Sequence, residues 1–317
     1  MWYNNSISLQ LQSDSIVLHG ANDSAPGQML RGSVHLDIQC RTKISSITVV
    51  FKGVASNQHL KPNHDIFYHK EVEFLRTIEV AKDFSPGHYI YHFEIPFPGD
   101  LPETTGSSLA SVRYKISAVA KRNGLAKNLK DTREVKVLRL TLPTTEIEES
   151  QSLLRFGELE SELAFCIFSP SVVYSPDNEI PIQIGVDSFK TDLKASEIKA
   201  TIYEVARSPT QNGKPKTKRT KIRETSSKWN TKSCGKMWIQ PIVLPANKDT
   251  EKVLSDRDND YVSVHHELNI SILLVKGDTI RKRIVIRTSL QFVDAEALEA
   301  VRSLPCYEQS METPPCY

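Results

Sequence analysis

The segment His265–Glu267 contains the only pair of adjacent histidines in the sequence, and histidines beside a glutamate suggest metal binding. A zinc-binding His-Glu-x-x-His motif places its second histidine four residues after the first and needs a helix to bring the two together. That position is Ile270, and the alternation of Val264, His266 and Leu268 is that of a β-strand. We therefore predict that His266 packs in the core and binds no metal.

A second histidine series, His59, His64 and His69, recurs every five residues. On an extended chain this spacing places successive histidines on opposite faces, so they would not share a metal ion. The sequence also lacks glycine-rich phosphate-binding loops and a Gly-x-Ser-x-Gly motif. Its five cysteines are widely spaced, with no Cys-x-x-Cys pair. We predict no catalytic residue, no metal and no cofactor, and hence a protein that is not an enzyme.

Two proline–tyrosine motifs lie near the C-terminal end of the sequence. They consist of Leu304, Pro305 and Tyr307, and of Pro314, Pro315 and Tyr317. Proline fixes φ at about −65° and favours the polyproline II conformation, which the aromatic grooves of WW domains bind at low entropic cost. The tyrosine adds a flat apolar ring with a polar tip for a neighbouring pocket. We predict that both motifs bind WW domains, the first more weakly because it lacks one proline.

A run of basic residues follows Pro209 and Gly213. The run contains Lys214, Lys216, Lys218, Arg219, Lys221 and Arg223. One interpretation is a solvated loop inserted between two strands. Another is contact with an anionic membrane surface. An arginine three residues before Ser226 makes that serine a candidate phosphorylation site.

The composition is that of an ordinary globular protein, with 317 residues, 39% of them hydrophobic and 25% charged. A net charge of +2 is too small to indicate a nucleic-acid partner. No secretory signal is visible, and no apolar run is long enough to cross a membrane. We expect a cytosolic or peripheral-membrane location.

Hydrophobic residues in the first half alternate with polar ones at a period of two, as in strands with one buried face. Val34, Leu36 and Ile38 show this pattern, and the segments Tyr91–Phe97 and Val112–Ala120 repeat it. Turns containing glycine, proline and asparagine separate the segments. The predicted fold class is all-β, an antiparallel β-sandwich.

The second half repeats the first at a nearly constant offset. Ser111–Ser117 corresponds to Ser263–Asn269, which places His266 at the position of Tyr114, and Ile47 corresponds to Ile198. Such a repeat indicates duplication of one sandwich. The predicted domains are a first sandwich at 1–142, an acidic linker at 143–162, a second sandwich at 163–293 and a tail with both proline–tyrosine motifs at 294–317.

The most specific segment of the sequence is Phe84–Glu103, FSPGHYIYHFEIPFPGDLPE, followed by Ser111–Ile116. Both resemble the N-terminal domain of the arrestin family. Tyr174–Pro176 and the strand Val262–Leu268 resemble its second domain. With the proline–tyrosine tail, the sequence is similar to the α-arrestins, the arrestin-related trafficking adaptors.

This resemblance implies two Ig-like antiparallel β-sandwich domains, recruitment of a WW-domain HECT-type ubiquitin ligase, and ubiquitin-dependent endocytosis of membrane transporters or receptors. It also implies a cytoplasmic protein that is recruited peripherally to the plasma membrane or to endosomes. In such an adaptor the basic run is a candidate contact for an acidic cargo tail, and its lysines are candidate ubiquitin acceptors. We therefore expect a non-catalytic adaptor whose concave domain surfaces engage the cytoplasmic tails of such proteins. The alternative is an arrestin-fold coat or sorting subunit of the retromer type. That alternative predicts a large exposed apolar patch and no dependence on the tail.

Overall fold

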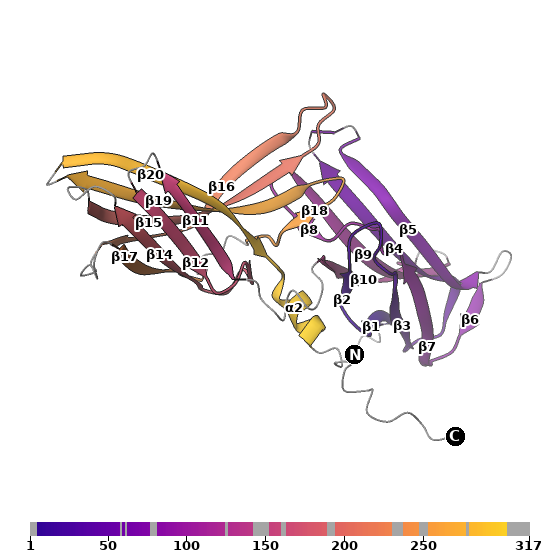
Figure 1. Cartoon of the computed structure of the whole chain (residues 1–317). Helices are drawn as coiled ribbons and strands as arrows, with labels where there is room; N and C mark the ends of the chain where they lie inside the picture. Colours follow the sequence, from indigo (N-terminus) through magenta and orange to yellow (C-terminus); the bar gives the residue numbers. More distant parts are fainter. Residues whose placement is uncertain are drawn as a thin grey trace, which may run out of the picture. The chain divides into compact units, whose positions relative to one another are not determined.

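The structure of the chain is a computed structural model. It describes residues 5–57, 59–60, 62–76, 81–123, 126–141, 152–159, 163–188, 194–229, 237–246, 253–276 and 279–302. These residues form β-strands and one short helix, α2 (Ala295–Arg302) (Figure 1). Within the described ranges, no helix has the length and apolar character needed to span a bilayer.

The chain divides into two compact units. Unit 1 contains Met1–Thr141 together with Ser208–Lys216 and Asn259–Val262, and unit 2 contains Leu142–Arg207, Thr217–Asp258 and Ser263–Tyr317. Unit 1 therefore includes two short segments from the second half of the sequence. The predicted first domain, a continuous range at 1–142, did not include them.

Unit 1 is a sandwich of two sheets around one apolar core. The first sheet has the order β1 (Ser6–Leu11), β3 (Gln28–Ile38), β7 (Gly87–Phe97). The second has the order β2 (Ser15–His19), β10 (Leu129–Leu140), β9 (Ala110–Arg122), β4 (Thr42–Asn57), β5 (His64–Arg76), with β6 (Lys82–Phe84) on β4 and β8 (Thr105–Gly106) on β9. Alternating residues such as Val34, Phe93 and Ile116 fill the space between the sheets, as the period of two predicts.

Unit 2 is a second sandwich with its own core. Its first sheet has the order β11 (Leu153–Leu159), β12 (Leu163–Ser169), β14 (Ile180–Ser188), β17 (Met237–Leu244). Its second sheet has the order β13 (Val173–Tyr174), β20 (Thr279–Phe292), β19 (Ser263–Lys276), β15 (Lys194–Ser208), β16 (Lys216–Lys228), with β18 (Arg257–Asp258) on β19. The predicted all-β class with two sandwiches is confirmed.

The larger sheets of the two units share one topology. In each, a short strand pairs in parallel with the next strand of the order, β2 with β10 and β13 with β20. The register is also shared, because Ile47 lies opposite Ala120 in unit 1 and the corresponding Ile198 lies opposite Ile272 in unit 2. This agreement supports the duplication inferred from the sequence.

The predicted acidic linker, 143–162, needs correction because it contains strand β11. Leu153 is buried, and β11 pairs with β12 along its whole length. The glutamates of this segment suggested a solvated connection, but an outer strand of a sheet accepts polar residues on its exposed side.

Within unit 1, Arg139 of β10 holds the turn that follows β7. Its guanidinium is buried and donates hydrogen bonds through Nη2 to the carbonyls of Gly99, at 2.7 Å, and Leu101, at 2.8 Å. The carboxylate of Glu103 lies 3.7 Å from Nε. Burial lowers the pKa of Arg139 and the charge of Glu103 opposes this shift, so each ion depends on the other.

Tyr114 of β9 holds the same turn from the core. Its hydroxyl donates a hydrogen bond of 2.5 Å to the carbonyl of Pro102. At Gly99 an added Cβ would lie 1.9 Å from the carbonyl oxygen of Ala25, so only glycine fits there. The most specific segment of the sequence thus contains a turn fixed by two buried side chains.

Substituting Arg139 by methionine should lower the free energy of unfolding of unit 1 by roughly 3–5 kcal/mol, because it leaves Glu103 buried without its cation. Adding Glu103→Gln should recover part of this loss. The matched control, Arg31→Met, breaks an exposed pair with Glu94 and should cost less than about 1 kcal/mol. Urea unfolding measures all three, and equal losses for Arg139→Met and Arg31→Met would contradict the role of the buried pair.

Candidate functional site

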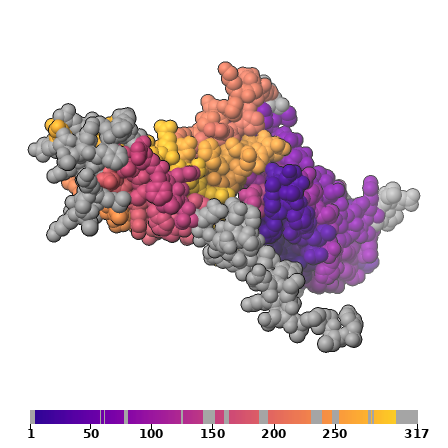
Figure 2. All heavy atoms as spheres, in the orientation of Figure 1, coloured from indigo at the N-terminus to yellow at the C-terminus, as the bar shows by residue number. Residues whose placement is uncertain are grey.

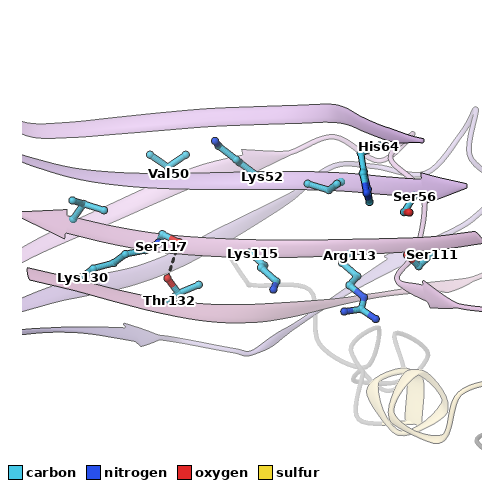
Figure 3. Close-up of a pocket in the computed structure, with 12 residues that line it drawn as sticks. Val50, Lys52, Ser56, His64, Ser111, Arg113, Lys115, Ser117, Lys130 and Thr132 are labelled. Carbon is cyan, nitrogen blue, oxygen red and sulfur yellow. Dashed lines mark hydrogen bonds between the residues drawn. The ribbon is translucent and has the colours of Figure 1, made fainter. Parts of the chain in front are cut away.

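The outward face of the larger unit 1 sheet is hollowed into a groove of about 820 Å³ (Figure 3). Strands β4, β9 and β10 and the start of β5 line it. Its polar side chains are predominantly basic, and we call the following set the cationic face: Lys52, His64, Arg113, Lys115 and Lys130.

Strand alternation places these side chains on one side of the sheet. On β9, Val112, Tyr114 and Ile116 point into the core, so Arg113 and Lys115 point outward. The sequence pattern predicted this alternation, and the structure confirms it. A hydrogen bond of 2.9 Å between the hydroxyls of Ser117 and Thr132 crosses the floor of the groove (Figure 3).

Like charges meet at the centre of the cationic face. Lys52 of β4 lies directly opposite Lys115 of β9, and on its other side Lys52 lies opposite His69 of β5. Like charges directly opposite one another across two strands destabilise a sheet. An anionic ligand bound beside the two lysines would relieve this repulsion.

The cationic face has few internal counter-ions. Lys115 forms an ion pair of 3.3 Å with Glu134. In the part of the chain that the structure describes, Lys52, Arg113 and Lys130 have no ion-pair partner. The groove therefore presents an excess of positive charge, which attracts anionic segments and is screened over about 8 Å at physiological salt.

The histidines of β5 differ from the prediction. A register shift between Gly53 and Val54 marks a β-bulge, and His64 and His69 lie opposite Ser56 and Lys52, which both face outward. The bulge cancels the alternation that would have placed the two histidines on opposite faces. Among the described residues, no group of three metal-ligating side chains could hold a metal ion.

Most of the predicted basic loop is instead part of strand β16, at the edge of the larger unit 2 sheet. Arg219 binds Glu267 at 3.0 Å and stacks over the ring of Tyr203, and Lys221 binds Glu224 at 3.2 Å. Alternating threonines and charged residues are typical of an exposed edge strand. The number of basic residues in the run instead suggested a solvated loop.

Arg223 is the clearest correction within this run. Its side chain is buried, donates hydrogen bonds to the carbonyls of Pro176 and Asn178, and packs over Phe292. Burial lowers the pKa of this guanidinium. It is therefore a structural cation of unit 2 and not a surface contact for membrane or cargo.

The other predicted site residues have different outcomes. Lys214, Lys216 and Lys218 are exposed, as is Ser226 on β16, so their proposed roles remain predictions. The two proline–tyrosine motifs lie outside the described residues. Sequence analysis missed the cationic face because Lys52, Arg113 and Lys130 are far apart in the chain. The only indication of the cationic face in the sequence was that such basic residues fall at outward-facing positions of predicted strands.

Comparison with known proteins supplies the family context for this face. Residues 21–141 match the family model of the arrestin (or S-antigen) N-terminal domain. These residues include the whole cationic face. The match supports the arrestin family.

Two proteins of Schizosaccharomyces pombe extend the similarity beyond this domain. Arrestin domain-containing protein C31A2.12 is 25% identical over 293 residues, covering 86% of this chain and 48% of that protein. Arrestin domain-containing protein C584.15c is 23% identical over 288 residues, covering 84% and 48%. The chain thus spans about half the length of these arrestin-domain relatives.

Replacing Lys52 by glutamine should stabilise unit 1 by roughly 0.2–1 kcal/mol, because it removes the charge opposite Lys115. The gain should shrink as salt is added. Lys130→Gln is the matched control, since Lys130 lies opposite the uncharged Val119 of β9. Chemical denaturation at low and high salt measures the effect. Destabilisation by Lys52→Gln would show that the interaction between Lys52 and Lys115 does not destabilise the folded unit.

Proposed function

We propose that this arrestin-family protein is an adaptor for ubiquitin-dependent endocytosis and sorting. In this proposal the cationic face binds an acidic cytoplasmic segment of a membrane transporter or receptor. The proline–tyrosine motifs at 304–317 then recruit a WW-domain HECT-type ubiquitin ligase. The observation that carries the proposal is the pair of opposed lysines, Lys52 and Lys115, on an arrestin N-terminal domain.

Binding energy would come from charge neutralisation in the groove. An extended acidic segment can lie along β4 and β9 and offer carboxylates to Arg113, Lys115 and Lys52 together. Relief of the like-charge repulsion adds to the attraction. The association should therefore be fast at low salt and weaken as salt rises.

Catalysis would belong to the ligase, and the adaptor would contribute proximity. Two weak proline–tyrosine motifs on one segment bind tandem WW domains with a high effective concentration. The exposed amines of Lys214, Lys216 and Lys218 are candidate ubiquitin acceptors on the adaptor itself. This division of roles needs no catalytic residue in the chain.

The proposal is tested by ubiquitination of a substrate that carries an acidic segment, with purified ligase and adaptor. Wild-type adaptor should increase the rate. Lys52→Gln with Lys115→Gln should remove the increase while WW-domain binding persists, and Tyr317→Ala should remove it while binding of the acidic segment persists. Tyr307→Ala should have a smaller effect.

The control is the pair Lys214→Gln and Lys216→Gln, which removes as much charge from an exposed segment of the chain. It should leave the rate of substrate ubiquitination unchanged. Stimulation that survives both the Lys52/Lys115 and the Tyr317 substitutions would contradict the adaptor mechanism.

A second candidate function, a coat or sorting subunit, is favoured by an apolar face on unit 2. The outward side of the sheet β11-β12-β14-β17 exposes Leu154, Phe156, Ile239 and Val243. Phe156 is 72% exposed, and Figure 2 shows the magenta atoms of β11 and β12 on the molecular surface. An exposed apolar patch of this kind marks protein interaction sites. Under this alternative, neither the Lys52→Gln and Lys115→Gln pair nor Tyr317→Ala would alter assembly with the sorting partner.

A further inference from the structure

The core of unit 2 contains an ionisable side chain that the adaptor function does not use. His266 of β19 is fully buried. Its Nδ1 lies 2.5 Å from Oδ1 of Asp256, and its Nε2 lies 3.8 Å from Oε2 of Glu204 on β15. The first distance is a short hydrogen bond, whereas the second is an ion-pair separation too long for one. The sequence predicted the burial of His266 but not its two carboxylate neighbours.

Both carboxylates also bind the backbone around the segment 253–258. Oδ1 of Asp256 accepts a hydrogen bond of 2.9 Å from the amide of Phe292 on β20, and Oε2 of Glu204 accepts one of 3.1 Å from the amide of Leu254. The amide of Asp256 in turn donates to the carbonyl of Phe292 at 2.7 Å. His266 is thus the common neighbour of the groups that fix this segment to β15 and β20.

Unit 1 has a corresponding contact with a different chemistry. Tyr114 and His266 occupy equivalent positions of the duplicated sheets, since Tyr114 lies opposite Gly53 and His266 lies opposite Glu204. Each reaches from the central strand to the segment that precedes it, through Pro102 in unit 1 and Asp256 in unit 2. Burial raises the pKa of the Tyr114 phenol, so that contact keeps its proton. The contact in unit 2 is made by a side chain that can lose one.

The proton state of His266 decides whether its second nitrogen is compatible with Glu204. In the imidazolium both nitrogens carry protons, so Nδ1 donates to Asp256 and the positive Nε2–H faces the Glu204 carboxylate. In the neutral form Nε2 presents a lone pair to that carboxylate. In the structure this buried nitrogen has no hydrogen-bond partner. The neutral state therefore leaves two carboxylates beside an uncharged ring.

The charged groups around His266 favour its protonated form. Burial by itself lowers the pKa of His266, but the hydrogen bond and charge of Asp256 and the charge of Glu204 outweigh burial and raise it. Arg223, which packs over the ring of Phe292 at 5.3 Å, is the cation on the β16 side. From β20, the neighbours are the apolar Leu290 and Phe292.

We propose that His266 is a protonation-controlled latch, whose imidazolium holds the segment 253–258 on unit 2 and whose neutral form releases it. Because the pKa is raised in the folded chain, the latch is fully closed below the ordinary histidine pKa of about 6.5. It opens as the pH rises through the folded value. The released segment leads directly into residues 259–262, which belong to unit 1.

The test is hydrogen exchange of the full chain, followed by mass spectrometry and expressed as protection factors between about pH 5.5 and pH 8.5. Protection of peptides covering 253–258 should fall at least tenfold as the pH rises in the wild type. Peptides covering 98–104, which Tyr114 holds, should show no such change. His266→Tyr and His266→Gln should abolish the pH dependence at 253–258.

A milder variant keeps the test decisive if those two do not fold. Asp256→Asn retains a hydrogen-bond acceptor but removes a negative charge, so it should move the midpoint of the transition at least one pH unit lower. The wild-type His266 resonance should titrate with the same midpoint as the loss of protection. Flat protection in the wild type, or an unchanged midpoint in Asp256→Asn, would overturn the proposal.

Discussion

Strand β9 lies inside the larger sheet of unit 1 and packs against the core on one face only. Each residue on it must therefore either fill the sandwich or face outward, and the two roles alternate. Tyr114 points inward and fixes the turn before the strand, while Arg113 and Lys115 on either side of it point to the groove. The rigidity of the core and the geometry of the cationic face are thus set by the same strand.

The duplicated strand β19 obeys the same constraint with a different outcome. Its inward position holds His266 where β9 has Tyr114, and its outward Glu267 pairs with Arg219. Glu267 thus neutralises an outward cation of unit 2, whereas in unit 1 Lys52 lies opposite Lys115 and, among the described residues, only Lys115 of the two has an ion-pair partner, Glu134. We infer that duplication gave the two units one topology and that their outward faces then took different tasks.

Most strands, and the duplication, were predicted from the sequence because both are visible in the local alternation of apolar and polar residues. Strand β11 was not predicted, because its glutamates matched the composition of a linker. The groove needed the register between β4 and β9, which brings Lys52 to Lys115 across more than sixty residues. A bulge in β5 and the buried carbonyl contacts of Arg223 likewise depend on tertiary packing that no local pattern encodes.

The most direct test of the cationic face is competitive acetylation of lysines in the full chain, with and without a saturating acidic peptide. Mass spectrometry gives the reactivity of each amine. The peptide should protect Lys52, Lys115 and Lys130 and leave Lys214 and Lys216 unchanged. Protection of Lys214 and Lys216 alone, or of no lysine, would contradict the claim that unit 1 binds its ligand through this sheet.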